Sequence, residues 1–225
     1  MTIGLGMKLR DGIILAADRQ MTAQGSHKYE EDKIFWIEGV HWNVFLTYCD
    51  SPSIAKEAKE KIEAALSPLD NNFSSEDYES PSLKAIKEEV EITLKEISNR
   101  YYENPAVELL VVIETQLEES QIFLYRDRAF HAVDGFCVIG CGDSPLFQYL
   151  KKAYSPKDSL EYGKKLAAYV LAKTGELVDK CGKGSDMLVI NHRGRTESLT
   201  KIETHRIILD IEMREINSLR KLISG

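Results

Sequence analysis

Hydrophobic and polar positions alternate at the beginning of the chain. Asp11-Gly12 favours a two-residue turn, and residues 13–17 form an apolar run that ends at Asp18. We therefore expect a hairpin that brings Asp18 back to the neighbourhood of Thr2. Over residues 3–9 every second side chain is apolar, the period of two that is typical of a half-buried strand, at Ile3, Leu5, Met7 and Leu9.

Strand patterns recur later in the chain, each bounded by turn residues. A second apolar hairpin is predicted over residues 33–38 and 41–47, after a polar stretch at 19–31 that we interpret as a loop or a short strand pair. Further strands are predicted at residues 108–115, 121–125, 130–133 and 136–139, and a last hairpin at 185–191 and 196–199.

Other segments carry apolar residues at spacings of three and four, the pattern of an amphipathic helix. One begins at Ser51-Pro52, and the next begins at Ser80-Pro81 after an exposed polar connection over residues 67–80. Later helices are predicted from about residue 144, from 158 to 179, and at the C-terminus. The apolar faces of the first, second and last helices are Ile54, Ala58, Ile62 and Ala65; Leu83, Ile86, Val90, Leu94, Ile97 and Tyr101; and Leu209, Met213, Ile216, Leu219 and Ile223.

The predicted order is strands, two helices, strands, two helices, a hairpin and a helix. Antiparallel hairpins with clustered helices favour the α+β class over a doubly wound parallel sheet. This order allows two stacked sheets, each covered by a pair of helices. Because neither flank of the polar connection can fold alone, we expect a single domain over residues 1–225.

Composition argues against several classes of function. The 225 residues include 29 Lys and Arg against 36 Asp and Glu, and the net charge of −7 argues against a nucleic-acid partner. No apolar run approaches the roughly 20 residues of a membrane span, and no signal peptide pattern opens the chain. We therefore expect a cytoplasmic protein without a membrane partner. The cysteines and histidines lack metal-ligand spacing, so we expect neither a metal nor another cofactor.

The second residue carries candidate chemistry. If Met1 is removed, Thr2 presents a hydroxyl and a free α-amine beside Asp18. Such an amine titrates at about 7.7–8.0, so it accepts a proton near neutral pH and one residue supplies both nucleophile and base. The alternative is a buried hairpin in which Thr2 is merely the first residue.

The segment from Thr2 to Asp18 resembles the opening of a proteasome β-subunit or of the related bacterial barrel peptidase, which are N-terminal nucleophile hydrolases. Residues 17–23, ADRQMTA, are similar to the family's ADxRxT segment, and residues 33–37, KIFWI, resemble its lysine followed by an apolar strand. The spacing from Asp18 to Lys33 is one residue shorter than usual. The resemblance covers nearly the whole chain in the order of its elements and implies a four-layer αββα sandwich.

The resemblance also implies a set of site residues. Thr2 is the nucleophile, Lys33 favours ionisation of its hydroxyl, Asp18 pairs with Lys33, and Asp179 supports the N-terminal amine. Thr22 would lie along a substrate cleft, where its strand pairs with an extended peptide. Each residue also has a plain structural interpretation, with Asp18 and Asp179 as acids at the ends of elements, Lys33 as a solvated lysine and Thr22 as a strand former.

Some positions depart from the family pattern. Cys141 and Gly182 stand where the family has serines near the amine; a cysteine donates only a weak hydrogen bond, and a glycine has no side chain to donate. Residues 47–51 replace a Gly-rich turn, so a backbone N–H is retained as an oxyanion donor while Tyr48 or Cys49 reshapes the substrate pocket. Weakened base chemistry is therefore an alternative.

The sequence leaves three functions open. The first is a threonine-type endopeptidase acting on peptides or unfolded proteins and activated by removal of Met1 alone. The others are a non-catalytic proteasome-like assembly subunit and an N-terminal nucleophile amidase or acyl transferase for a non-protein amide. The resemblance implies a homo-oligomeric ring or barrel, with apolar residues near Trp36, Trp42 and Tyr48 as an indication of contacts between subunits, and it leaves room for an ATP-dependent unfoldase.

Overall fold

The computed structural model describes residues 2–22, 28–49, 51–70, 80–101, 108–116, 118–140, 143–179, 181–182, 184–192 and 195–224. Within these ranges the strands form two five-stranded antiparallel sheets and one short strand pair. The first sheet has the order β10 (Phe136–Gly140), β1 (Ile3–Leu9), β2 (Gly12–Asp18), β11 (Ser185–Asn191) and β12 (Arg195–Leu199). The second has the order β5 (Ile34–Glu38), β6 (Trp42–Cys49), β7 (Glu108–Thr115), β8 (Gln121–Arg126) and β9 (Ala129–Val133).

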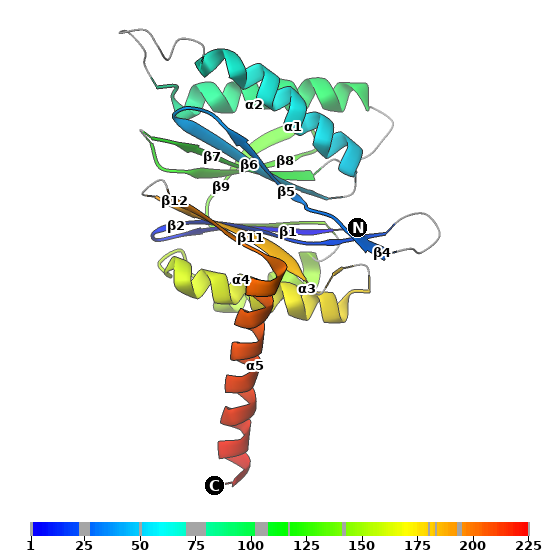
Figure 1. The fold of residues 1–225 in the computed structure, drawn as a ribbon, viewed down its shortest axis with the longest axis vertical. Helices are drawn as coiled ribbons and strands as arrows, with labels where there is room; N and C mark the ends of the chain where they lie inside the picture. The colour runs from blue at the N-terminus through cyan, green and yellow to red at the C-terminus, as the bar shows by residue number, and fades with distance from the viewer. Residues whose placement is uncertain are drawn as a thin grey trace.

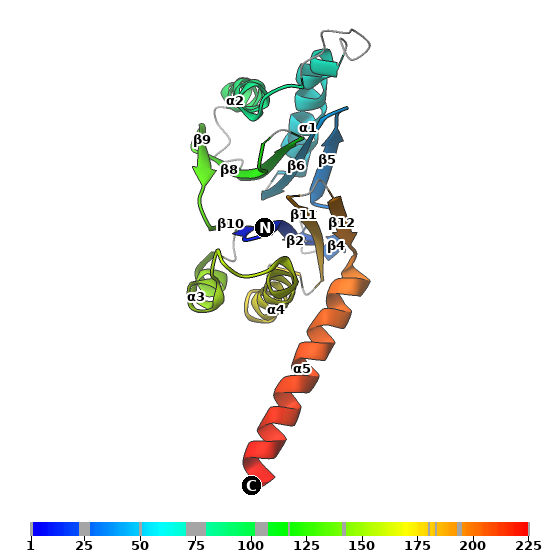
Figure 2. The ribbon, with the colours of Figure 1, turned by 90° about the vertical axis from the view of Figure 1, so that its left-hand side faces the viewer.

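The two sheets stack face to face, and helices cover both outer faces (Figures 1 and 2). Helices α3 (Asp143–Ala153) and α4 (Leu160–Leu177) lie against the first sheet, and α1 (Pro52–Leu66) and α2 (Leu83–Arg100) lie against the second. A short 3-10 turn, η1 (Ser67–Asp70), follows α1. The expected α+β class and its αββα layering are therefore confirmed.

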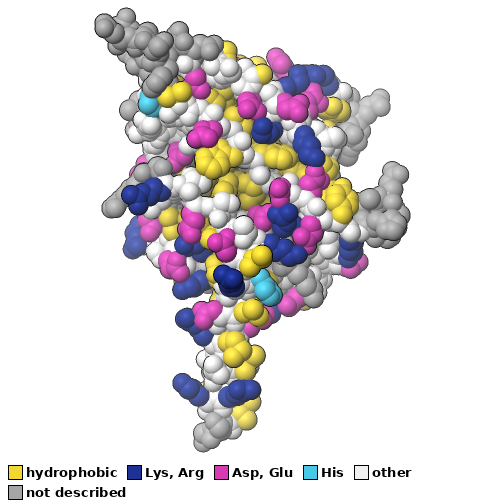
Figure 3. All heavy atoms as spheres, viewed as in Figure 1, with side chains coloured by type: hydrophobic (Ala, Val, Ile, Leu, Met, Phe, Trp, Pro, Cys, Tyr) yellow, Lys and Arg dark blue, Asp and Glu magenta, His cyan; other side chains and the backbone are white. Residues whose placement is uncertain are grey.

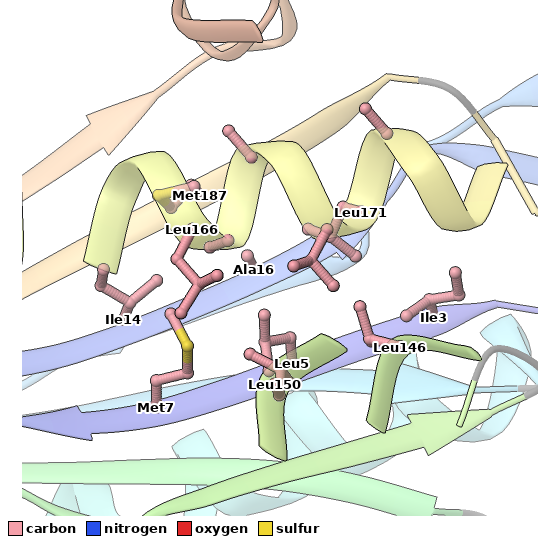
Figure 4. Close-up of a cluster of buried hydrophobic side chains, with 14 of the residues drawn as sticks. Ile3, Leu5, Met7, Ile14, Ala16, Leu146, Leu150, Leu166, Leu171 and Met187 are labelled. Atoms are coloured by element: carbon pink, nitrogen blue, oxygen red, sulfur yellow. The ribbon is translucent and has the colours of Figure 1, made fainter. Parts of the chain in front are cut away.

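Three buried layers hold the sandwich together. The layer between the first sheet and its helices takes the alternate residues of β1 and β2 together with α3, α4 and Met187, as Figure 4 shows. A matching layer lies between the second sheet and α1 and α2. The opposite faces of the strands meet in the layer between the sheets, which contains Ile13, Leu15, Phe45, Val112, Ile122 and Ile190. Strands β2 and β7 are apolar on both faces, because both of their faces are covered.

The helix boundaries follow local capping chemistry. Helix α2 begins at Leu83 and not at the predicted Ser80-Pro81, because the Ser82 hydroxyl accepts a hydrogen bond from the Ala85 N–H at 3.2 Å. Its predicted apolar face is buried from Leu83 to Ile97. In α1 the predicted Ala65 is only partly buried, and Leu66 is buried in its place.

The first hairpin differs from the prediction by one residue. Leu9 pairs with Gly12, so its turn is Arg10-Asp11 and not Asp11-Gly12. Gly12 already belongs to β2, where an added Cβ would lie 2.2 Å from the Ile190 carbonyl oxygen of β11. The polar stretch after β2 contains the predicted strand pair, β3 (Gln20–Thr22) with β4 (Lys28–Glu30).

The last helix, α5 (Lys201–Ser224), leaves the body of the molecule (Figure 1). Only its first turns pack on the core, through Thr204 and Ile208. Most of its predicted apolar face is solvent-exposed in this chain, at Leu209, Met213, Ile216 and Ile223, and the neighbouring Leu222 is exposed as well. Figure 3 shows apolar side chains along the protruding helix.

Part of the expected apolar surface is exposed. Trp36 is 45% exposed and Val40, close to Trp42 in the chain, is also exposed, but Trp42 and Tyr48 themselves are buried in the core. Among the described helices, none is both long and apolar enough to cross a bilayer.

Candidate active site

Several strand ends meet at one end of the first sheet. β1 begins at Ile3, which pairs with Gly140 at the end of β10, and β2 ends at Asp18, which pairs with Ser185 at the beginning of β11. The hairpin predicted from the sequence thus returns Asp18 to the beginning of β1. The residue before β1, Thr2, lies among these ends.

The Asp18 carboxylate is the centre of a hydrogen-bond network and is only 1% exposed. Its Oδ1 accepts the Ile3 N–H at 2.8 Å and the Lys33 ammonium at 2.9 Å. Its Oδ2 accepts the backbone N–H groups of Gln20 at 3.1 Å and Gly182 at 2.9 Å. Because every contact is a donor, the site is built for an ionised carboxylate.

Lys33 is the buried partner of Asp18. It is 1% exposed, precedes β5, and also donates to the Gln20 carbonyl. One carboxylate oxygen therefore bridges the Lys33 ammonium and the first peptide N–H after Thr2. A buried ammonium is costly unless it is paired and hydrogen-bonded, and both conditions hold here. The prediction that Asp18 and Lys33 form a pair agrees with this geometry.

Thr2 is fully buried, and its hydroxyl has no hydrogen-bond partner among the residues that the structure describes. A buried hydroxyl without a partner costs free energy and is uncommon in folded proteins. The unpartnered hydroxyl therefore makes Thr2 a candidate reactive residue. Thr2, Asp18 and Lys33 are the predicted residues that the structure brings together.

Gly140 closes the space beside Thr2. Its φ of +88° lies in the left-handed region, and an added Cβ would lie 1.8 Å from the Thr2 carbonyl oxygen. Only a glycine lets β10 approach the residue before β1 so closely.

Glu108, the first residue of β7, was not among the predicted site residues. Its Oε2 accepts the Gly140 N–H at 3.0 Å and the Cys49 thiol at 3.3 Å, and its Oε1 lies 2.5 Å from the Arg126 guanidinium. Glu108 therefore ties β6, β7 and β10 together directly behind Thr2. The available signal was a charged residue at the start of an apolar strand, which also fits an ordinary exposed strand end.

Replacing Glu108 with alanine is expected to lower the free energy of unfolding by about 2 kcal/mol, because a guanidinium and a buried N–H lose their shared acceptor. Urea unfolding followed by circular dichroism measures the change. Glu119→Ala, at an exposed position of the same charge, is the control and is expected to change stability by less than about 0.5 kcal/mol. Equal stabilities of the two variants would contradict the role of Glu108.

Gly182 reaches the network with its backbone. Position 182 lacks the serine hydroxyl of the family pattern, but the Gly182 backbone N–H donates a hydrogen bond to Asp18. An added Cβ would lie 2.7 Å from the Gln20 Cβ and 3.2 Å from the Asp18 carboxylate, so the position favours glycine. Gln20 was likewise not among the predicted site residues. Its backbone N–H donates to Asp18 and its carbonyl accepts from Lys33. Its Cβ leaves no room for a serine side chain at position 182.

Asp179 does not join the buried network. Its side chain is 95% exposed and forms an ion pair with Lys28 at 3.1 Å, while its carbonyl accepts hydrogen bonds from Lys28 and Gln20. The amine-supporting role predicted for Asp179 does not match this placement, because an exposed carboxylate paired with Lys28 is screened from the buried Thr2. Cys141 lies outside the described residues.

The predicted substrate contacts lie on different faces. Residues 47–49 belong to strand β6, not to a turn. Tyr48 points into the layer between the second sheet and its helices and stacks on Phe35 at 5.6 Å, so the prediction that it lines a substrate pocket is not supported. Its neighbour Cys49 faces the layer between the sheets, on the side of Thr2. Thr22 ends β3, where its backbone pairs with Lys28.

A cavity of about 780 Å³ borders the network. Gln20 and Gly182, both donors to Asp18, lie on its wall together with Asp179, Lys28 and Arg19. The cavity is therefore a space beside the network with charged walls. Within the described ranges, no cluster of three or more His, Cys, Asp or Glu side chains is placed to hold a metal ion.

The sequence model of the family described as "Proteasome subunit" matches residues 2–190. None of the curated proteins searched matches the chain.

The fold is similar to solved structures of Anbu proteins at low sequence identity. A mutant of Anbu from Hyphomicrobium sp. strain MC1 is 14% identical over 99% of both chains, with a TM-score of 0.78. Anbu, named an ancestral β-subunit, from Yersinia bercovieri is 13% identical over 97% of this chain and 96% of its own, with a TM-score of 0.74. The helical assembly of the Anbu complex from Pseudomonas aeruginosa is 14% identical over 99% and 95%, with a TM-score of 0.74. The match of the family model over most of the chain shows that this protein belongs to the proteasome subunit family.

Proposed function

We propose that the protein is a threonine-type N-terminal nucleophile peptidase whose reactive residue is Thr2. The observation that carries this proposal is the buried Thr2 hydroxyl without a partner among the described residues, one residue before Ile3, whose N–H donates to Asp18 of the Asp18–Lys33 pair. Membership of the proteasome subunit family supports it, since the arrangement occurs at the N-terminal strand that the family model matches.

The chemistry requires that Met1 is removed. The freed α-amine of Thr2 then takes the hydroxyl proton, directly or through a water, and the oxygen attacks the peptide carbonyl. The Lys33 ammonium stabilises the developing alkoxide, while Asp18 holds Lys33 charged and in place. The C–N bond breaks as the amine returns its proton to the leaving nitrogen. Water then hydrolyses the Thr2 ester and regenerates the enzyme.

A peptide epoxyketone tests this proposal. The purified chain, verified by mass spectrometry to begin at Thr2, is expected to gain the mass of one probe, with the adduct on Thr2 in the fragment spectrum. Thr2→Ala is expected to form no adduct and to lose peptide hydrolysis by about 10⁴-fold or more. An intact mass without adduct, on a folded chain that begins at Thr2, would refute the peptidase assignment.

A non-catalytic assembly subunit is the second candidate. It is favoured by Gly182, which contributes no hydroxyl to the site, and by the exposed placement of Asp179. A retained Met1 blocks the amine and distinguishes this candidate from the peptidase. The intact mass of the purified protein therefore separates the two candidates before any activity is measured.

We also propose that copies of the chain assemble through α5. The helix exposes Leu209, Met213 and Ile216 to between 44% and 55%, which is costly for an isolated chain in water. The related Pseudomonas aeruginosa structure is described as a helical assembly, which supports an oligomer for this chain.

Sedimentation velocity tests the assembly. The wild-type chain is expected to sediment as an oligomer, and the double variant Met213→Glu with Ile216→Glu is expected to shift toward the monomer. Asn217→Glu, exposed on the same helix, adds a charge without removing an apolar contact and is the control. A wild-type chain that sediments as a monomer at all concentrations would rule the assembly out.

A further inference from the structure

A second polar cavity lies at the end of the sandwich that is remote from Thr2. β6 begins at this end with Trp42 and finishes beside the active site with Cys49. The cavity has a volume of about 570 Å³. Its walls come from the turn between β5 and β6, from the segment that follows β7, and from His192 after β11 of the other sheet.

Glu114 is the buried charged residue of this cavity, with 6% of its surface exposed. It is two residues after Val112, so its side chain lies on the face of β7 that meets the other sheet. Asn43 is directly opposite on β6, and its Nδ2 donates to the Glu114 Oε2 at 2.8 Å. A carboxylate in this layer is unexpected, because Leu110 and Val112, on the same face of β7, are apolar.

The orientation of Asn43 is determined by a third residue. The Trp36 indole N–H, which can only donate, contacts the Asn43 Oδ1 at 3.0 Å. The amide nitrogen of Asn43 must therefore face Glu114, so one carboxylate oxygen is satisfied. The other oxygen, Oε1, is buried without a hydrogen-bond partner within the described part of the chain.

A carboxylate oxygen and an imidazole nitrogen of this cavity can both accept hydrogen bonds. Besides the Glu114 Oε1, the Nδ1 of His192 is buried and has no hydrogen-bond partner in the described ranges. Glu38, Glu114 and Glu118 line the cavity, and none of the described residues that line it is a lysine or an arginine. A ligand that matches these walls must donate hydrogen bonds and carry positive charge.

We propose that this distal cavity binds a small organic cation with N–H donors, an alkylammonium or guanidinium group, with Glu114 as its counter-ion and His192 as a further acceptor. Burial raises the pKa of Glu114, and the Asn43 hydrogen bond acts in the opposite direction. A bound cation would favour the ionised carboxylate. The inference uses no residue of the peptidase site and does not depend on the proposed function.

Isothermal titration with methylguanidinium chloride tests the site. The full-length wild-type protein is expected to bind it with a saturable heat and a dissociation constant in the millimolar range, because the cation forms a single ion pair, with Glu114. Methylurea has nearly the same shape but no charge, and tetramethylammonium has the charge but no N–H donor. Both are expected to bind at least about tenfold more weakly, equivalent to about 1.4 kcal/mol.

Two variants locate the binding. Glu114→Gln keeps the shape and the Asn43 contact but removes the charge, and it is expected to weaken methylguanidinium binding by about tenfold or more. His192→Ala, on the other sheet, is expected to weaken it by several-fold. Glu96→Gln makes the same charge change at an exposed position of α2 and is expected to bind as the wild type does.

Three results would overturn the proposal. The first is no saturable heat for the wild type, which would mean that water alone fills the cavity. The second is binding of methylurea as tight as that of methylguanidinium, and the third is unchanged methylguanidinium binding by a folded Glu114→Gln variant. If Glu114→Gln does not fold, the comparison of the three ligands on the wild-type protein still decides whether the cavity selects a cation with N–H donors. Thr2→Ala is expected to leave this binding unchanged, so failure of the peptidase assignment and failure of this site are distinguishable.

Discussion

Replacing Lys33 with alanine is expected to lower the free energy of unfolding by about 3–5 kcal/mol. The Lys33 ammonium and the Asp18 carboxylate are both 1% exposed and lie 2.9 Å apart. Removing the ammonium leaves the carboxylate buried with only neutral backbone donors, and its desolvation is then no longer offset by an opposite charge. Urea unfolding, followed by circular dichroism, measures the loss of stability.

Lys59→Ala is the matched control for this prediction. Lys59 forms an ion pair with Glu63 at 2.8 Å, a similar distance, but on the exposed surface of α1. Its loss is expected to cost less than about 1 kcal/mol, because water screens an exposed pair. If Lys33→Ala and Lys59→Ala have the same stability, the Asp18–Lys33 pair does not organise the site.

The second large effect is expected for Gly140→Ala, which should destabilise the protein by about 3–5 kcal/mol. The new Cβ would lie 1.8 Å from the Thr2 carbonyl oxygen, a backbone atom that cannot rotate away. The strand β10 or the segment before β1 must therefore shift, and reaction of Thr2 with the epoxyketone is expected to fall with it. Thermal and urea unfolding measure the first effect, and the mass of the adduct measures the second.

Gly135→Ala separates the clash from the backbone conformation. Gly135 also has a positive φ, of +116°, but an added Cβ there would meet only the Tyr154 ring, at 3.6 Å and 3.7 Å. It is expected to cost only the about 1–2 kcal/mol of placing a side chain at positive φ. Equal losses for the two variants would show that the close approach to Thr2 is not what requires glycine at position 140.

The first hairpin predicts one part of the site, and the family resemblance implies the role of Lys33. Asp18 ends the hairpin whose apolar alternation is visible from Ile3 onward, and Lys33 stands directly before the next apolar strand. Hairpin geometry alone therefore predicts that Asp18 returns to Thr2. Gln20, Gly182 and Glu108 could not be assigned in this way, because the first two act through backbone atoms and the third lies behind the site on another sheet.

Tyr48 and Cys49 show why a one-residue difference matters. Adjacent residues of a strand point to opposite faces, so Tyr48 enters the helix-facing core while Cys49 faces the layer between the sheets. The sequence around them is apolar on both sides and does not indicate which face is which. Pairing of β6 with β7 sets that choice.

The last helix shows the same limit on a larger scale. Its apolar spacing predicts an amphipathic helix from Leu209 to Ile223, and the helix is present. Its spacing does not say what covers the apolar face, and in the single chain the face is exposed along most of its length.

Residue spacing was therefore sufficient for the elements, the α+β class and the pairing of Asp18 with the beginning of the chain, because these depend on neighbours close in sequence. Tertiary packing was required to know that Asp179 lies in solvent, that Gly182 donates to Asp18, that Glu108 accepts from Gly140, and that Glu114 is buried at the distal end. Those facts depend on strand register and on contacts between residues far apart in the chain, which no local pattern encodes.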